Sequence, residues 1–161
     1  MPVGRKKGKD KRMREILFRA KLKSDNGIHK KGEWVYGHYC ELIDGKKAIP
    51  YIYGNGEVNK NTIGQYTGLT DKNGKKVFEG DIVKNDWCFL RGYSVIKFGQ
   101  YKPLDMSNDY QQGHLGFYLE HIHKVDKNTA RKDIMYFANK CEVIGNIHDN
   151  PELLESEVDT E

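Results

Sequence analysis

Residues 66–83 have the sequence YTGLTDKNGKKVFEGDIV, and this stretch is the clearest indication of the fold class. Two short segments with β-branched and aromatic residues flank the turn sequence DKNG at 71–74. Asn-Gly is a strong turn signal, because glycine adopts positive φ without a steric penalty. A further glycine, Gly80, interrupts the second segment, which is typical of a bulge or a tight bend in a strand. The stretch therefore predicts two short strands joined by a tight turn.

The same short-strand pattern continues toward the N-terminus. Apolar residues recur at every second position of 16–22, which suits a strand with one buried face. The aromatic-rich residues 33–53 contain an Asp-Gly turn at 44–45 and predict a β-hairpin. Pro50 lacks a backbone donor, so the returning strand of this hairpin is expected at the edge of a sheet.

Toward the C-terminus, short segments rich in strand-forming residues predict further strands at 93–98, 116–121 and 142–147. The polar residues 100–113 predict a long loop, and residues 127–139 fit either a helical turn or a strand. Pro151 after Asn150 matches the start of a helix, so a short helical turn is expected near the C-terminus.

Many short strands separated by glycine and asparagine turns, without long helices between them, are typical of all-β proteins. We therefore expect a mainly antiparallel, small barrel-like domain that ends in the short helical turn. No internal repeat and no linker divides the chain, so a single folded domain is expected.

The two ends of the chain carry opposite charges. Residues 1–12 hold six basic side chains and one acidic one, whereas 150–161 hold five acidic side chains and no basic one. Both ends are poor in apolar residues, so they cannot bury enough surface to offset the entropy lost on ordering. We expect a disordered basic extension at 1–12, a β domain at 13–154 and an acidic flexible tail at 155–161.

The composition also excludes several classes of protein. No stretch approaches the roughly 18–20 apolar residues of a membrane span. No apolar segment follows the basic N-terminus as it does in a signal peptide. The three cysteines, Cys40, Cys88 and Cys141, form no CxxC pair, which argues against a disulfide scaffold and a structural zinc site. We expect a cytoplasmic protein without a membrane partner.

The basic arm at 1–12 has two interpretations. It is a solvated extension upstream of a start at Met13, or it binds nucleic acid by neutralising phosphates. In the second interpretation, aromatic and basic side chains of the β domain add a stacking platform for single strands. The candidate binding residues are Arg5, Lys6, Lys7, Lys9, Lys11 and Arg12 of the arm, with Trp87, Arg91, Tyr93 and Lys97 of the domain.

Three histidines, His114, His121 and His123, form an HX6HXH cluster. On a strand, His121 and His123 share one face, which metal chelation can use. A metal-dependent hydrolase or nuclease that uses this cluster with Asp81 is therefore the alternative function. The chain contains no GxxxxGK[ST] motif, no GxGxxG after a strand and no GxSxG elbow. We accordingly expect no enzymatic activity, no cofactor and no biological metal site.

Three blocks of the sequence occur in a familiar order: MREILFRA at 13–20, YTGLTDKNGKKVFEGDIV at 66–83 and CEVIGNIHDNPELL at 141–154. Together they resemble the YopX family of phage and prophage proteins. The resemblance implies a small, mainly β protein in the cytoplasm of an infected or lysogenic bacterial cell. It supplies no catalytic residues to carry over.

The segment EGDIV at 79–83 is similar to a strand that opens several SH3-like barrels, so we expect the barrel to be SH3-like, by analogy of fold alone. We expect an accessory or binding protein encoded by a phage or prophage. Its partner is nucleic acid, bound without sequence preference, or a protein of the phage or host. The large aromatic content also predicts a homo-oligomer.

Overall fold

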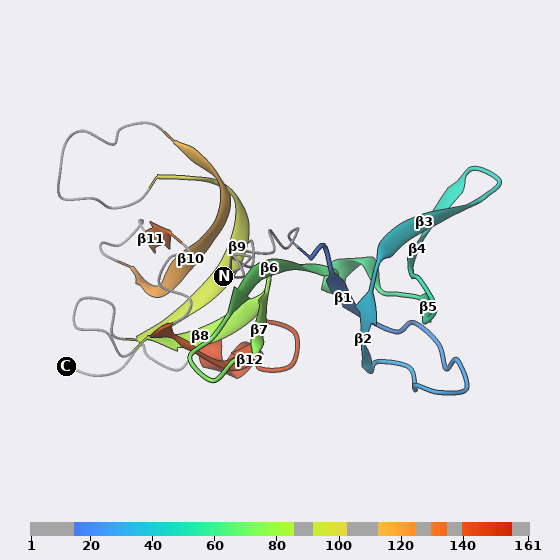
Figure 1. Ribbon diagram of the computed structural model, residues 1–161, viewed down its shortest axis with the longest axis horizontal. Coiled ribbons are helices and arrows are strands. Elements are labelled where there is room, and N and C mark those ends of the chain that lie inside the picture. The colour runs from blue at the N-terminus through green and yellow to red at the C-terminus, as the bar shows by residue number, and fades with distance from the viewer. Residues whose placement is uncertain (1–14, 86–91, 103–112, 125–129, 135–139, 156–161) are drawn as a thin grey trace, which may run out of the picture.

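The computed structural model describes residues 15–85, 92–102, 113–124, 130–134 and 140–155, with 123–124 and 130–134 described by their backbone alone (Figure 1). The described residues fold into three antiparallel sheets, so the expected all-β, mainly antiparallel class is confirmed. Within these ranges, no helix is long and apolar enough to cross a membrane.

The first sheet has the strand order β2-β1-β6-β7. Its strands are β1 (Phe18–Lys21), β2 (Trp34–Gly37), β6 (Gly64–Thr70) and β7 (Lys76–Phe78). β6 and β7 pair across the DKNG turn. Asp71 Oδ1 accepts hydrogen bonds from the amides of Asn73 and Lys75 and thereby closes this turn. The predicted strand-turn-strand unit is confirmed.

Gly80 redirects the chain from the first sheet into the second. Its φ is +82°, a conformation that glycine adopts without a steric penalty. β7 ends at Phe78 before this bend, and β8 (Asp81–Asn85) begins after it in another sheet. The bend predicted at Gly80 is confirmed, whereas the single strand predicted around it is two strands in different sheets.

The second sheet has the order β11-β10-β9-β8-β12. Besides β8, its strands are β9 (Gly92–Tyr101), β10 (His114–Lys124), β11 (Ala130–Ile134) and β12 (Glu142–Asn146). The strands predicted at 93–98, 116–121 and 142–147 are therefore confirmed. Residues 130–134 of the ambiguous segment form a strand, and the central part of the predicted loop, 103–112, lies outside the described residues.

The third sheet is a small one with the order β3-β4-β5. Its strands are β3 (Tyr39–Asp44), β4 (Lys47–Ile52) and β5 (Gly56–Glu57). The predicted turn at 44–45 is confirmed, because Asp44 pairs with Lys47 across it. The strand before the turn is broken at His38, and its first part is β2 of the first sheet. The hairpin is thus shorter than predicted.

The prediction that Pro50 marks an edge strand is wrong, because β4 lies between β3 and β5. On the β5 side, the Pro50 carbonyl accepts a hydrogen bond from the Val58 amide. In an antiparallel ladder, the N–H and C=O of one residue point the same way. The backbone nitrogen of Pro50 therefore points toward the β5 side, where β5 ends at Glu57. The lack of an N–H there does not interrupt the β3–β4 ladder.

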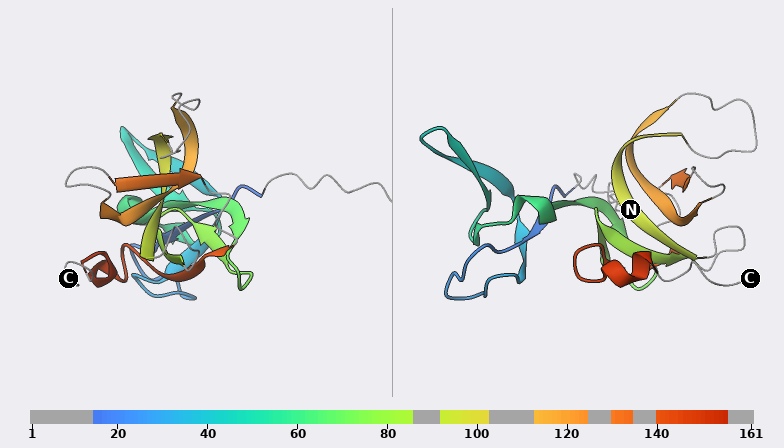
Figure 2. Two further views of the ribbon diagram at one scale, coloured as in Figure 1. Left: turned by 90° about the vertical axis from the view of Figure 1, so that its left-hand side faces the viewer. Right: turned by 180° about the vertical axis from the view of Figure 1, so that it is seen from behind.

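Two separate clusters of buried side chains form the core. One joins β7, β8, β9, β10 and β12 through Val77, Val83, Ile96, Leu119, Cys141 and Val143. The other joins β1, β2, β4 and their neighbours through Ala20, Leu22, Val35, Ile52 and Val58. Figures 1 and 2 show the corresponding two lobes, with the third sheet projecting away from the second.

The expected barrel is not confirmed, because each of the three sheets has two end strands and none closes on itself among the described residues. The expected C-terminal turn is present as a 3₁₀ helix, η3 (Pro151–Leu154). The Asn150 side chain does not cap it. Its Oδ1 accepts a hydrogen bond from the Asn146 amide, and its Nδ2 donates to Glu152.

Candidate functional site

A buried ion pair joins the first and second sheets. Arg19 of β1 places Nη2 2.6 Å from Oδ1 of Asp81, and the two side chains are 8% and 1% exposed. Arg19 Nη2 also donates to the Glu79 carbonyl, and Asp81 Oδ2 accepts from the Phe78 amide. Burial raises the pKa of Asp81, and the charge of Arg19 opposes this effect.

Aromatic rings enclose the Arg19 guanidinium. Its Cζ lies 4.8 Å from the centroid of Trp34 and 5.0 Å from that of Phe78. These distances are typical of cation–π contacts, which strengthen when water is excluded. Arg19 Nε has no hydrogen-bond acceptor among the described residues. The rings and Asp81 therefore hold the guanidinium in place.

Asp149 connects the same region to the C-terminal segment. Its Oδ2 accepts hydrogen bonds from Trp34 Nε1 at 2.6 Å and from Asn146 Nδ2 at 2.8 Å, and its Oδ1 pairs with Lys21. Burial alone would raise the pKa of Asp149. The hydrogen bonds from Asn146, Lys21 and Trp34 outweigh burial and lower this pKa to about 2.

The three sequence blocks thus meet through polar side chains. Arg19 of the block at 13–20 pairs with Asp81 of the block at 66–83. Asp149 of the block at 141–154 bonds to Trp34, which contacts Arg19. It also pairs with Lys21, which lies on the same strand as Arg19. A second link lies at the DKNG turn, where Asp71 Oδ2 accepts a hydrogen bond from the Val143 amide. These groups bond mainly to one another, so they hold the segments together rather than face a ligand.

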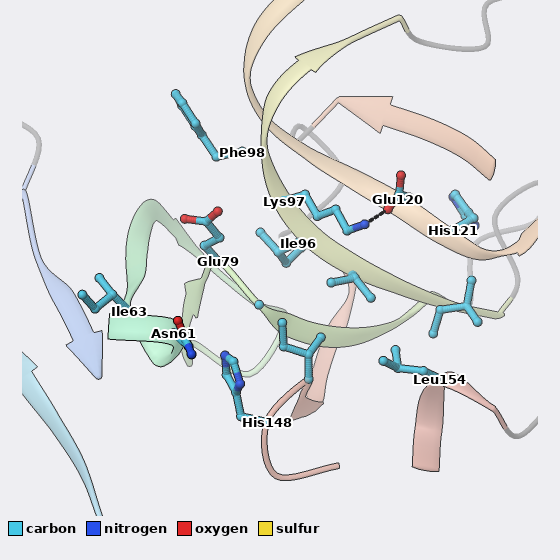
Figure 3. A pocket seen from close by; sticks show the side chains of 14 residues that line it. Asn61, Ile63, Glu79, Ile96, Lys97, Phe98, Glu120, His121, His148 and Leu154 are labelled. Atoms are coloured by element: carbon cyan, nitrogen blue, oxygen red, sulfur yellow. Dashed lines mark ion pairs between the residues drawn. The ribbon is translucent and has the colours of Figure 1, made fainter. Parts of the chain in front are cut away.

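An open pocket of about 760 Å³ adjoins this cluster, between the Gly80 bend, β9, β10 and the C-terminal turn (Figure 3). Its apolar lining is Ile63, Val95, Ile96, Phe98, Ile122, Ile147 and Leu154. Its polar lining is Asn61, Glu79, Lys97, Glu120, His121 and His148. A hollow of this size, lined by apolar side chains and a few polar groups, is typical of ligand sites. We call it the Glu79 pocket.

Two ionisable groups of the Glu79 pocket are perturbed by burial. Burial raises the pKa of Glu79, and hydrogen bonds from the backbone of Gln65 and Phe98 only partly oppose it. Burial, followed by the nearby charges of Lys21 and Arg19, lowers the pKa of His148. The His148 ring is therefore mostly neutral at pH 7.

A second hollow, of about 530 Å³, lies between β1, the following loop, β4 and the 3₁₀ helix η1 (Lys60–Thr62). Five of the side chains that line it are lysines: Lys21, Lys23, Lys31, Lys47 and Lys60. Among its described lining residues, the carboxylate is Glu57. We call this hollow the lysine groove.

Two of the groove lysines have acidic partners. Lys21 pairs with Asp149, and Lys23 Nζ lies 2.5 Å from Glu57 Oε1. Within the described part of the chain, no carboxylate pairs with Lys31, Lys47 or Lys60. The groove therefore offers three uncompensated positive charges. Sequence reasoning missed it, because its lysines come from four separate segments.

Most of the predicted nucleic-acid residues lie outside the described residues, namely Arg5, Lys6, Lys7, Lys9, Lys11, Arg12, Trp87 and Arg91. Tyr93 is partly buried on β9 opposite Lys84. Lys97 lines the Glu79 pocket and pairs with Glu120. Tyr101, at the end of the same strand, is buried against Tyr118 with ring centroids 4.9 Å apart. It is therefore not available for stacking on bases.

The predicted histidine cluster is not assembled in the described residues. His114 and His121 both lie on β10, seven positions apart. Because side chains alternate along a strand and the two positions differ by an odd number, these two point to opposite faces. Among residues whose side chains are described, no three His, Cys, Asp or Glu side chains gather as metal ligands. The His123 side chain lies outside that description.

Of the cysteines, Cys141 is buried, Cys40 is partly exposed and Cys88 lies outside the described residues. Glu79 and Asp81, which flank Gly80, do not act as a carboxylate pair. Glu79 lines the pocket, whereas Asp81 pairs with Arg19.

Comparison with known protein families finds one whose description is YopX protein, and its model matches residues 7–155. This match begins six residues before Met13, the boundary expected from the sequence, and covers nearly the whole chain. A search of curated proteins finds no match to the chain.

Proposed function

The chain belongs to the YopX family, and we propose that it is a binding module. It binds the phosphates of nucleic acid without sequence preference. The observation that carries the proposal is the lysine groove, where Lys31, Lys47 and Lys60 have no acidic partner in the described structure. Lysines that neutralise phosphates release counterions, which drives binding to any sequence.

The lining of the groove explains the expected lack of sequence preference. The described residues that line it include no aromatic side chain on which bases could stack. Lysine presents a flexible point charge, which positions a phosphate but does not identify a base. The groove is therefore suited to a backbone, and the bases of the bound strand face away from it.

Fluorescence anisotropy tests the proposal with labelled oligonucleotides of two unrelated sequences, each as a single strand and as a duplex, at low salt. The full chain is compared with the triple variant Lys31→Ala, Lys47→Ala, Lys60→Ala. We expect the wild type to bind all four probes with similar affinity and the triple variant to bind at least about tenfold more weakly.

A matched variant separates the groove from net charge. The control variant removes the same number of positive charges from exposed positions outside the groove: Lys75→Ala, Lys76→Ala, Lys140→Ala. If this control weakens binding as much as the groove variant, the groove is not the site. If the wild type binds none of the probes, the nucleic-acid function is refuted, and a phage or host protein becomes the partner to seek.

We further propose that the module is an accessory protein encoded by a phage or prophage and acts in the bacterial cytoplasm. Family membership supports this setting. The short strands on either side of Gly80 support a distant relation to SH3-like barrels, whose strands also bend between sheets. A metal-dependent hydrolase is not proposed, because no observation of the described side chains favours it.

A further inference from the structure

Glu79 is the uncompensated carboxylate of the pocket named after it. The side chain is half-buried at the bend before Gly80, and among the described residues no lysine or arginine pairs with it. Its carboxylate is stabilised by backbone amides of Gln65 and Phe98, and burial still raises its pKa. A half-buried carboxylate gains most from a positively charged partner, because water screens the attraction less there.

The other charges of the pocket do not supply that partner. Lys97 of β9 pairs with Glu120 of the neighbouring strand β10, as the dashed line in Figure 3 shows. The pKa of His148 is lowered by burial and by Lys21 and Arg19, so its ring is mostly neutral at pH 7. With these groups counted, the carboxylate of Glu79 gives this part of the pocket a negative character.

The remaining wall is apolar and reaches the surface. Phe98 is 51% exposed and packs edge-on against Phe117. Ile147 and Leu154 line the side of the C-terminal segment, and Ile63 lines the side of η1. Exposed apolar surface next to a carboxylate suits a ligand that combines a cation with an apolar group.

We propose that the Glu79 pocket binds the guanidinium of an arginine side chain in a partner peptide, together with an adjacent apolar side chain. The guanidinium donates to the Glu79 carboxylate, a charge-assisted contact that arginine can make with two parallel hydrogen bonds. The apolar neighbour lies on Phe98. Among the described residues, only Asn61 borders both this pocket and the lysine groove, so the inference does not depend on nucleic-acid binding.

Isothermal titration calorimetry tests the proposal with the acetylated, amidated tripeptide Leu-Arg-Leu and the full chain. The matched probe replaces arginine with citrulline, which keeps the shape and removes the charge. Agmatine supplies the guanidinium without a peptide. We expect the arginine peptide to bind at least about tenfold more tightly than the citrulline peptide, because charge-assisted contacts are roughly twice as strong as neutral ones.

Two variants assign the binding to the pocket. Glu79→Gln is expected to weaken binding of the arginine peptide by about tenfold or more. Phe98→Ser is expected to weaken binding of both peptides. Glu142→Gln, which removes the partner of Lys72 outside the pocket, serves as the control and leaves binding unchanged. Melting curves confirm that each variant folds, and peptide-induced amide shifts at Gly80 and Phe98 give a readout that does not depend on affinity.

Equal binding of the arginine and citrulline peptides would overturn the proposal, as would full affinity in Glu79→Gln. Failure of the arginine peptide to bind at millimolar concentration would overturn it too. Agmatine that binds as tightly as the tripeptide would refute the peptide as the ligand and show a small cation in its place. The nucleic-acid titration is unaffected by each of these results.

Discussion

The Arg19 guanidinium lies 2.6 Å from the Asp81 carboxylate, and this buried contact joins β1 of the first sheet to β8 of the second. β1 contributes Ala20 to one hydrophobic cluster, and β8 contributes Val83 to the other. The ion pair therefore connects the two lobes.

The first prediction concerns this pair. Asp81→Asn leaves the Arg19 charge buried without compensation, which typically costs about 3–5 kcal/mol. We expect the free energy of unfolding, measured by urea denaturation, to fall by an amount of this order. Lys76→Ala is the control, because it removes an exposed ion pair with Glu15 that contributes about 0–1 kcal/mol. Equal losses in the two variants would contradict the structural role of the buried pair.

The second prediction concerns the close approach of β6 to the chain before Gly80. A Cβ on Gly64 would lie 2.5 Å from the Glu79 carbonyl oxygen, which is backbone and cannot rotate away. Overpacking of this kind costs about 1–3 kcal/mol. We expect Gly64→Ala to lower the melting temperature clearly.

Gly116→Ala provides the comparison, because a Cβ there meets no atom within 4 Å. We expect its stability to stay within about 0.5 kcal/mol of the wild type. A melting temperature of Gly64→Ala equal to that of Gly116→Ala would show that β6 and the Glu79 carbonyl are farther apart than described.

The third prediction concerns stability at acid pH. The pKa of Asp149 is lowered from 3.8 to about 2, so its contribution to stability is present above pH 3.8 and is lost as the pH falls toward 2. We expect Asp149→Asn to flatten the fall in melting temperature between about pH 4 and pH 2.

Trp34→Phe tests the cause of the lowered pKa. It removes one of the hydrogen bonds to Asp149 and keeps an aromatic ring near Arg19. With less stabilisation of the carboxylate, its pKa lies closer to the unfolded value of 3.8. The fall in stability at acid pH should therefore be smaller and end at a higher pH than in the wild type. If the fall in melting temperature at acid pH is unchanged in both variants, Asp149 is not its cause.

The turn chemistry of the sequence predicted much of the fold. The DKNG turn, the turn at 44–45 and the bend at Gly80 all lie where the residue types require them, because such signals act within a few positions. The sheet that each strand joins was not predictable in the same way. β2 and β3 are adjacent in sequence and enter different sheets, since their partners lie far along the chain.

The candidate sites were less accessible to sequence reasoning. The lysine groove draws on Lys21, Lys31, Lys47 and Lys60, which lie on separate elements and form no charge run. Glu79 lies beside the bend predicted at Gly80, and the sequence around it predicts no pocket. Its position in a pocket depends on β9, β10 and the C-terminal turn, which pack around it from distant parts of the chain.

The fourth prediction concerns self-association. β3 is an end strand of its sheet, and its residues Leu42 and Ile43 are 48% and 72% exposed. Exposed apolar side chains on an unpaired strand edge favour pairing with another chain. We expect the average mass from light scattering to rise between a dilute and a concentrated sample, and Ile43→Lys to reduce that rise. A monomer at both concentrations would end this expectation.

The fifth prediction uses salt to separate the basic arm from the lysine groove. The logarithm of affinity falls by about 0.7 to 0.9 per neutralised phosphate for each unit in the logarithm of salt concentration. The three unpaired groove lysines should therefore give a slope of about −2 to −2.7. The arm at 1–12, with about 4–5 neutralised phosphates, should add roughly −3 to −4.5.

Deletion of residues 1–12 should leave a binding protein with the shallower slope of the groove. The triple variant Lys31→Ala, Lys47→Ala, Lys60→Ala should keep the steeper slope of the arm. Combining the two changes should abolish binding, because contributions from separate contacts to phosphates add. If the truncated chain instead loses all binding while the triple variant binds like the wild type, the arm acts alone and the groove has another role.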